Sequence, residues 1–279
     1  MTWDDLDASL DAVPGTVSAY VGRLDAPPTW TRHARAGHYA ASTMKVAVLA
    51  ALYRAAEAGT LDLAADVPVV NEFDSAQPGA ARFSCAAHYD NDDAVWDRLG
   101  GTATLRWLAE RMIVRSSNLA TNLVIAHVGL PAVAEVWALA GARDSVTGRG
   151  IEDFAARDAG ITNTVTAADL AALLGTLAAG ATTPGRLASP AGCAAMLDVL
   201  LAQEHREDLA AGLPEGTRIA LKNGWVRGVR HAVGVVLPDD APPYVIAVCT
   251  TTDLTDRDDD ACQLLARVSA QAWAARHRL

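Results

Sequence analysis

The chain has 279 residues, of which 51% are hydrophobic, and its formal net charge is −10. This length and apolar content suffice for one large domain or two smaller ones with a substantial core. The acidic balance makes nucleic acids and anionic membrane surfaces poor partners. No stretch approaches the ~20 consecutive apolar residues that a membrane-spanning helix needs.

The first residues are acidic, whereas a secretory signal begins with basic residues and continues into an apolar run. We therefore expect a cytoplasmic protein from the sequence as it stands, and a secreted one if a leader has been removed. The histidines show no zinc-binding spacing, so neither a metal nor another cofactor is predicted. The four cysteines lack C-x-x-C spacing and are expected to be reduced, mostly buried thiols. They are Cys85, Cys193, Cys249 and Cys262.

Apolar residues recur with helical spacing in several segments that mostly end at Gly or Pro. The helices expected from this pattern cover residues 3–12, 43–57, 104–129, 131–140, 166–179, 190–203 and 256–278. Other segments are rich in β-branched or alternating residues, as strands are. These expected strands cover residues 16–24, 29–36, 217–221, 229–237 and 244–252. Residues 60–100 are expected to be irregular, with the acidic segment Asp90–Asp93 as a solvated loop.

Strands at both ends of the chain, with helices between them, predict an α/β (α+β) fold in which the two termini build one antiparallel sheet. We expect residues 1–48 and 206–279 to form this α/β sheet domain and residues 49–205 to form an inserted all-helical lobe. A cleft should lie where the two parts meet, and the helix after Ser42 should line it.

Ser42-Thr43-Met44-Lys45 opens the expected helix 43–57 and carries the first candidate chemistry. Residues three apart share a helix face, so the Lys45 amine and the Ser42 hydroxyl should lie together. A desolvated lysine can lose its proton and then act as the base that activates a serine. The S-x-x-K pattern is short, however, and a serine N-cap followed by a snorkelling lysine also satisfies it.

Two later stretches carry polar residues at unexpected places. Ser116-Ser117-Asn118 interrupts an apolar helical region, so it either caps its own turn or faces a cleft. Lys222-Asn223-Gly224 puts a cation and a glycine at the end of an expected strand, where a ligand can approach the backbone closely. Alone, each also fits an ordinary helix cap or strand end.

Together and in this order, the three stretches resemble the motifs of the penicillin-recognising serine hydrolases, which include class A β-lactamases, transpeptidases and carboxypeptidases. Those motifs are S-x-x-K, S-D-N and K-T-G. The first motif matches fully, while Ser117 and Asn223 replace the middle residues of the second and third. The resemblance spans residues 16–278 and implies the β-lactamase/transpeptidase-like fold.

The resemblance implies a catalytic role for three residues. Ser42 would attack a carbonyl carbon and become acylated, and Lys45 would take its proton. Ser116 would relay a proton to the leaving nitrogen. The developing oxyanion would be held by the backbone N–H groups of Ser42 and Trp225, a contribution that is commonly worth several kcal/mol.

The resemblance also implies which residues bind substrate. Asn118 would hold Lys45 and the substrate amide, while Lys222 would supply positive potential to Ser116 and to a substrate carboxylate. Asn223, Gly224 and Trp225 would complete this side of the binding site. The amide of Asn223 replaces a hydroxyl, so its hydrogen-bond geometry differs from that of the family.

The deacylation base is the largest departure from the pattern. Class A enzymes carry E-x-x-x-N on a loop after the second motif, and here no Asn follows Glu152 at that spacing. Glu152 or Asp153 could activate the deacylating water, or both could belong to a solvated acidic loop. Asn163 lies too far downstream for the family spacing. Efficient β-lactam hydrolysis is therefore not predicted by these residues.

Three functions remain open from the sequence, each with a small-molecule substrate or ligand. The first is a class A-type serine hydrolase that opens a β-lactam-like amide or ester through a Ser42 acyl-enzyme. The second is a carboxypeptidase, esterase or transacylase on the same fold with poor β-lactam turnover. The third is a non-catalytic ligand-binding relative, for which Ser42→Ala would leave affinity unchanged. The oligomeric state is not addressed by the sequence.

Overall fold

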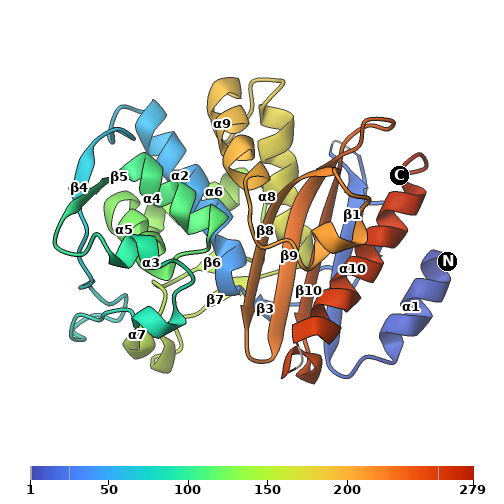
Figure 1. The fold of residues 1–279 in the computed structure, drawn as a ribbon, viewed down its shortest axis with the longest axis horizontal. Coiled ribbons are helices and arrows are strands. Elements are labelled where there is room, and N and C mark those ends of the chain that lie inside the picture. Colours follow the sequence, from blue (N-terminus) through green and yellow to red (C-terminus); the bar gives the residue numbers. More distant parts are fainter. Residues whose placement is uncertain (1, 25, 257) are drawn as a thin grey trace.

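The computed structural model describes residues 2–24, 26–256 and 258–279. One five-stranded antiparallel sheet lies at the centre of the fold, in the order β2-β1-β10-β9-β8 (Figure 1). Its strands are β1 (Thr16–Arg23), β2 (Trp30–Arg32), β8 (Arg218–Val226), β9 (Val229–Leu237) and β10 (Tyr244–Thr251). The sheet is built from both ends of the chain, so the predicted fold class is confirmed.

Helices cover both faces of this sheet. Two terminal helices, α1 (Trp3–Asp11) and α10 (Asp258–Ala275), lie on the outer face, and α8 (Ala167–Gly180) packs on the inner face (Figure 1). The remaining helices form a lobe beyond the inner face. They are α2 (Lys45–Glu57), α3 (Asp93–Trp96), α4 (Leu105–Val114), α5 (Asn118–Val128), α6 (Leu130–Leu139), α7 (Phe154–Asp158) and α9 (Pro190–Leu201).

Two small antiparallel sheets complete the fold. The first has the order β3-β7-β6 and connects the segment before Ser42 to the segments on either side of α7. The second pairs β4 with β5 at the edge of the helical lobe. Their bounds are β3 (His38–Tyr39), β4 (Asp66–Pro68), β5 (Thr102–Thr104), β6 (Val146–Thr147) and β7 (Asn163–Val165).

Strand β10 shows why the central sheet needs helices on both sides. Successive side chains of a strand point to opposite faces, and in β10 both sets are apolar and buried. Ile246 and Val248 pack with α1 and α10, whereas Val245 and Ala247 pack with the helical side of the fold. The four cysteines are all buried, and none of them forms a disulfide with another described residue, as predicted.

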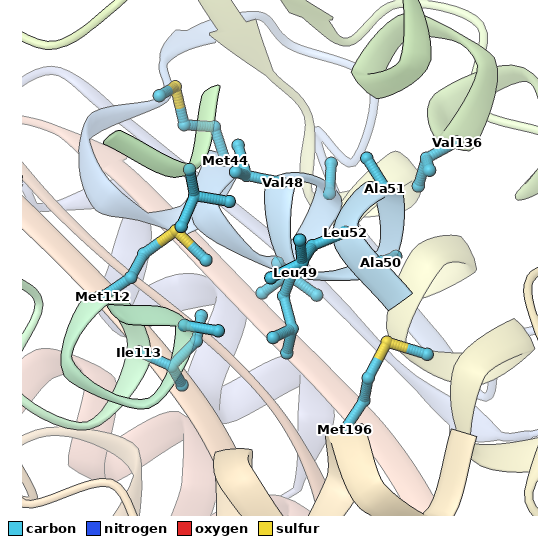
Figure 2. Close-up of a cluster of buried hydrophobic side chains, with 14 of the residues drawn as sticks. Met44, Val48, Leu49, Ala50, Ala51, Leu52, Met112, Ile113, Val136 and Met196 are labelled. Atoms are coloured by element: carbon cyan, nitrogen blue, oxygen red, sulfur yellow. The ribbon is translucent and has the colours of Figure 1, made fainter. Parts of the chain in front are cut away.

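Helix α2 is the centre of the inner core. Residues 45–53 are all buried, because helices surround α2 on every side. Figure 2 shows Met112 and Ile113 of α4, Val136 of α6 and Met196 of α9 gathered around Leu49 and its neighbours. The core is continuous from this lobe to the inner sheet face. The predicted boundary between residues 48 and 49 falls within α2, and the division into two domains stays a prediction.

Several predicted elements differ in extent from the observed ones. Strand β8 continues to Val226 rather than ending at Leu221, and β2 covers Trp30–Arg32 only. The predicted helix 104–129 is two helices, which break at the Ser116–Ser117 turn. The closing helix was predicted from residue 256, and residue 257 lies outside the described residues. Within the described residues no single helix is long and apolar enough to cross a membrane, although α5 and α6, bent by 89°, pass that test as a pair.

The acidic segment Asp90–Asp93 is not simply a solvated loop. Asp92 is 2% exposed and forms an ion pair with Arg111 of α4. Asp90 is bonded to the start of α5. In this acidic segment, Asp93 alone is exposed. The expectation was wrong for Asp90 and Asp92 because their partners lie about 20 to 30 residues further along the chain.

Two buried histidines predict how stability depends on pH. His231 donates from Nε2 to the Tyr39 carbonyl (2.9 Å) and accepts at Nδ1 from the Thr250 N–H (3.0 Å), which only neutral imidazole can do. His38 lies between the hydroxyls of Ser18 and Thr251. Burial lowers the pKa of both rings from 6.5 to about 4.

We expect the free energy of unfolding to fall as the pH drops from about 6.5 towards 4, because the unfolded chain then binds protons that the folded rings exclude. At pH 5 the loss should be on the order of 2 kcal/mol for each ring. Urea unfolding at pH 7.5 and pH 5 measures it, and NMR titration of the ring carbons checks the assignment. Either ring titrating above pH 6 in the folded protein contradicts the prediction.

Candidate active site

Ser42 lies in a short 3₁₀ turn, Ala41–Met44, that leads directly into α2. Ala40 is the N-cap of this turn and Met44 that of α2, so the alternative of Ser42 as an N-cap does not hold, and its hydroxyl makes no hydrogen bond with the described residues. The preceding Ala41 has φ +44°, a conformation that an L-residue rarely adopts. Ser42 is half-buried between buried neighbours, Ala41 and Thr43, and lines a cavity.

Lys45 is fully buried one turn after Ser42. Its ammonium donates to the Ser116 carbonyl (2.8 Å) and to Asn118 Oδ1 (3.0 Å), with longer contacts to Ser116 Oγ and the Ser117 carbonyl (3.4 Å each). Burial lowers the pKa of Lys45 to about 7, against the opposing charge of Asp90. A large fraction of the amine is therefore neutral near pH 7 and can accept a proton.

Lys222 reaches the same place from β8. Its ammonium donates to Ser116 Oγ (3.1 Å) and to the Asn223 carbonyl (2.7 Å), and it is fully buried. Burial and then the charge of Lys45 hold the pKa of Lys222 well below its ordinary value. Ser116 has φ +60°, so a strained turn holds its hydroxyl between two amines.

The structure thus joins Lys45, Ser116, Asn118 and Lys222 by direct hydrogen bonds. Among the described residues, no hydrogen bond connects Ser42 Oγ to Lys45, although the two residues are one turn apart on neighbouring helical segments. Such contacts are often long without substrate and shorten when it binds.

Gly224 lets β8 approach the turn that carries Ser42. A Cβ at this position would lie 2.6 Å from the Ser42 nitrogen and 2.9 Å from the Thr43 nitrogen. These backbone atoms cannot move without separating the strand from the helix start. The close approach brings the N–H of Ser42 beside the strand that continues into Trp225.

Asp90 is a site residue that the sequence did not reveal. Its Oδ2 accepts from Ser117 Oγ (3.1 Å) and from the N–H groups of Asn118 (3.0 Å) and Leu119 (2.8 Å). A carboxylate is thereby placed at the positive end of α5. The family motif has an aspartate where Ser117 stands, and here Asp90 supplies that charge from another loop. The acidic segment was the available signal, but it did not indicate this partner.

We expect Asp90→Asn to shift the acidic limb of the acylation rate to lower pH, because the Asp90 charge raises the pKa of Lys45. The rate above that limb should fall as well, since a neutral amide holds Ser117 and Asn118 less firmly. A pH profile of acylation measures both effects. Asp93→Asn, exposed in the same loop, is the matched control. If the acidic limb of the pH profile lies at the same pH in Asp90→Asn as in the wild type, the Asp90 charge does not raise the pKa of Lys45.

Asn223 and Trp225 are two residues apart in β8, so their side chains leave the same face of the strand. The Asn223 side chain is buried and donates to the His205 carbonyl (3.0 Å) and to Asp208 (3.2 Å), so it does not line the cavity. Trp225 does line the cavity, with its ring against His205 and over the Arg230 guanidinium. Both residues contact His205, and only Trp225 also reaches the cavity wall.

Glu152 lies in the wall of the cavity, and its backbone has a φ of +66°. One carboxylate oxygen accepts from the Ala86 N–H (2.9 Å), and the other is buried without a partner among the described residues. Burial raises the pKa of this carboxyl. Asp153 is fully buried and accepts from Ser75, Ala76 and the start of α7, so it is occupied as a cap.

The loop before α7 is clamped by two asparagines. Asn122 of α5 accepts from the Ile151 N–H and donates to its carbonyl (2.8 Å each), which holds Ile151 against the lobe. Asn163 accepts from the N–H groups of Gly148 and Arg149 and closes the neck of the loop. Ile151, rather than an acid, is the residue held opposite α5.

The cavity that these walls enclose has a volume of about 820 Å³. Aromatic and apolar side chains alternate with charged ones around Ser42, as in many small-molecule sites. The lining residues are Tyr39, Ala41, Ser42, Tyr89, Asn91, Asn118, Arg149, Ile151, Glu152, Phe154, Arg157, Thr162, Trp225, Val226 and Arg227. Within the described part of the chain, no group of His, Cys, Asp and Glu side chains could hold a metal ion.

The fold, with its cavity between sheet and helical lobe, is that of the β-lactamases and the related transpeptidases. The chain belongs to the β-lactamase enzyme family, whose model matches residues 2–275. A comparison with curated protein sequences found no match.

Solved structures agree with this family. A β-lactamase from Sphaerobacter thermophilus is 28% identical, with a TM-score of 0.81, and the alignment covers 100% of this chain and 98% of that one. A PBP-A variant, described as an acyl-enzyme complex with penicillin G, is 24% identical with a TM-score of 0.78 over 99% and 96% of the chains. An ancestral class A β-lactamase is 22% identical with a TM-score of 0.80 over 98% of each chain.

Proposed function

We propose that this protein is a serine acyl-hydrolase that forms an acyl-enzyme on Ser42 with a β-lactam or another small amide or ester. One observation carries the proposal: two buried amines, of Lys45 and Lys222, meet at the Ser116 hydroxyl beside the turn of Ser42. Burying two amines against one hydroxyl is costly for stability, because both lose their solvation, so a catalytic use is the best explanation.

In the acylation step, Ser42 Oγ forms a bond to the substrate carbonyl carbon while the neutral amine of Lys45 accepts the hydroxyl proton. Negative charge develops on the carbonyl oxygen, beside the Ser42 N–H and the strand that Gly224 holds against it. The C–N or C–O bond then breaks, and the leaving atom takes a proton from Ser116 Oγ. Proton transfer from Lys45 restores Ser116, leaving an ester at Ser42.

The experiment is intact-mass analysis after incubation with benzylpenicillin. We expect the mass of one complete penicillin on the wild-type protein and no adduct on Ser42→Ala, with the modified peptide mapped to Ser42. Wild-type protein that gains no adduct from any β-lactam or activated ester, and that turns over no chromogenic cephalosporin, would overturn the proposal.

A second candidate, fast acylation followed by slow release or transfer, is favoured by the loop before α7. Glu152 is engaged by the Ala86 N–H, Asp153 is a helix cap, and the clamped residue opposite α5 is Ile151. Glu152 keeps one carboxylate oxygen without a partner among the described residues, but it follows the clamped Ile151 rather than occupying the position opposite α5, which favours slow deacylation. Single-turnover kinetics distinguish the two: a long-lived adduct supports a transacylase or carboxypeptidase type, and equal rates support a β-lactamase.

A further inference from the structure

Arg149 is a buried arginine whose charge is not neutralised by any carboxylate among the described residues. It is 3% exposed, and no carboxylate among the described residues forms an ion pair with it. Its guanidinium donates only to neutral oxygens, the Gly150 carbonyl (3.2 Å) and Tyr39 Oη (3.4 Å), and its Nε is buried without a partner. The buried Arg230, by contrast, is paired with Asp208 and Glu207. An unpaired buried charge is costly unless something else compensates it.

Arg149 and Tyr39 form one corner of the cavity that Ser42 lines. Tyr39 Oη accepts from Arg149, so its own O–H proton remains available for donation, and no acceptor for it lies among the described residues. The guanidinium lies 5.6 Å from the Tyr39 ring. The corner therefore offers the Tyr39 hydroxyl as a donor, next to the positive charge of Arg149.

The corner is held rigidly by β7. Tyr39 pairs with Thr164 in this strand, and the next residue back, Asn163, binds the backbone N–H and carbonyl of Arg149. Tyr39 and Arg149, which are far apart in the sequence, are thus held by the adjacent residues Thr164 and Asn163. A receptor held this way loses little conformational entropy when it binds a ligand.

The charge of the corner predicts an anionic ligand. The whole chain carries −10, yet Arg149 sits uncompensated in the cavity wall. Arg157, another lining residue, is already bound to its neighbour Asp158. A carboxylate can accept from Tyr39 Oη and gain the nearby Arg149 charge, the arrangement in which hydrogen bonds are strongest.

The position of the corner indicates which end of the substrate it meets. Ser116 and Lys222 occupy the leaving-group side in the proposed mechanism, and in the described part of the chain neither forms a hydrogen bond with Tyr39 or Arg149. The β3–β7 wall is separate from them, so the acyl part of a Ser42 ester would extend towards it.

We propose that Tyr39 and Arg149 form a receptor for a carboxylate on the acyl portion of the substrate, so that preferred acyl donors are anionic at that end. This inference rests on the proposed function and specifies its substrate class. Tyr39 and Arg149 take no part in forming or breaking bonds; they position the acyl chain.

The test compares benzylpenicillin with its α-carboxy derivative, which shares the ring system, the leaving amine and the ring carboxylate. Second-order acylation rate constants come from quenched intact-mass time courses. We expect the carboxylated donor to react at least about tenfold faster with the wild type. Arg149→Gln and Tyr39→Phe should bring the ratio close to one, and Arg149→Lys should restore part of it.

Arg157→Gln is the matched control, because it also removes a positive charge from the cavity wall but from a guanidinium already paired with a carboxylate. Its ratio should stay within about twofold of the wild type. If Arg149→Gln does not fold, Tyr39→Phe decides the question, since it removes only one hydroxyl.

The inference is overturned if both donors acylate Ser42 at equal rates in the wild type, or if the ratio survives in Tyr39→Phe. It is also overturned if both donors slow equally in the variants, which would indicate a structural role. If benzylpenicillin acylates Ser42 and the carboxylated donor reacts no faster, the proposed function stands and only this inference is wrong. Acylation by neither donor removes this inference, and it removes the proposed function as well if no other β-lactam or activated ester gives an adduct and no chromogenic cephalosporin is turned over.

Discussion

Lys45→Met is expected to lower the rate of Ser42 acylation by about 10³-fold or more, since general-base catalysis by a positioned group contributes on this scale. Methionine nearly matches the length and volume of the lysine chain without the amine. The change leaves the Ser116 carbonyl and Asn118 Oδ1 without the Lys45 donor, at about 1–3 kcal/mol each, but it also removes the desolvation cost of a buried amine. The loss of rate should therefore occur in a folded protein, which thermal unfolding checks.

The pH dependence of the acylation rate shows whether Lys45 acts as a base or only supports the structure of the site. In the wild type the acylation rate should rise through about pH 7, the pKa to which burial lowers Lys45, because only the neutral amine accepts a proton. One unit below that pKa, about a tenth of the amine is neutral. Lys45→Met should lose this limb. A variant that acylates within tenfold of the wild type, or a wild-type rate that is flat from pH 5.5 to 8.5, speaks against the mechanism.

Gly224→Ala is expected to reduce acylation by about 10²- to 10³-fold, the range seen when one oxyanion donor is lost. The added methyl would lie 2.6 Å from the Ser42 nitrogen, so β8 and the start of α2 must separate. That separation moves the Ser42 N–H away from the position where negative charge develops. Pre-steady-state acylation with a chromogenic cephalosporin measures the effect.

The control is Gly175→Ala in the interior of α8, where the new methyl would meet the Leu24 carbonyl at 3.7 Å, an ordinary contact. Alanine favours a helix over glycine, so this variant should be at least as stable as the wild type and equally active. Wild-type acylation by Gly224→Ala would show that the strand is free to move without affecting the oxyanion position.

The sheet strands were predictable because they are apolar on both faces, and β9 was predicted at its observed bounds, Val229–Leu237. Strand β8 was predicted too short because Lys222 and Asn223 interrupt the apolar pattern. Both side chains are nevertheless buried, Lys222 against Ser116 and Asn223 against Asp208. A polar residue can remain in a buried strand when a distant segment satisfies it, and local pattern does not record that partner.

The same limit applies to the candidate site. Spacing within the chain placed Ser42 one turn before Lys45, and the order of the three motifs indicated Ser116, Asn118 and Lys222. It did not indicate Asp90, whose contacts are with α5 about 28 residues later, nor the inward turn of Asn223. Glu152 keeps its place in the cavity wall, but its part in deacylation stays a prediction.

The sequence by itself determined the family motifs, the two-ended antiparallel sheet and the helical face that carries serine and lysine, since each depends on residue type and near-neighbour spacing. Only the tertiary structure decided that burial lowers the pKa of Lys45 to about 7, that Gly224 lies against the turn of Ser42, and that Arg149 has no carboxylate partner among the described residues. These properties depend on burial and on contacts between segments far apart in the chain, which exist only once the sheet and the lobe have packed together.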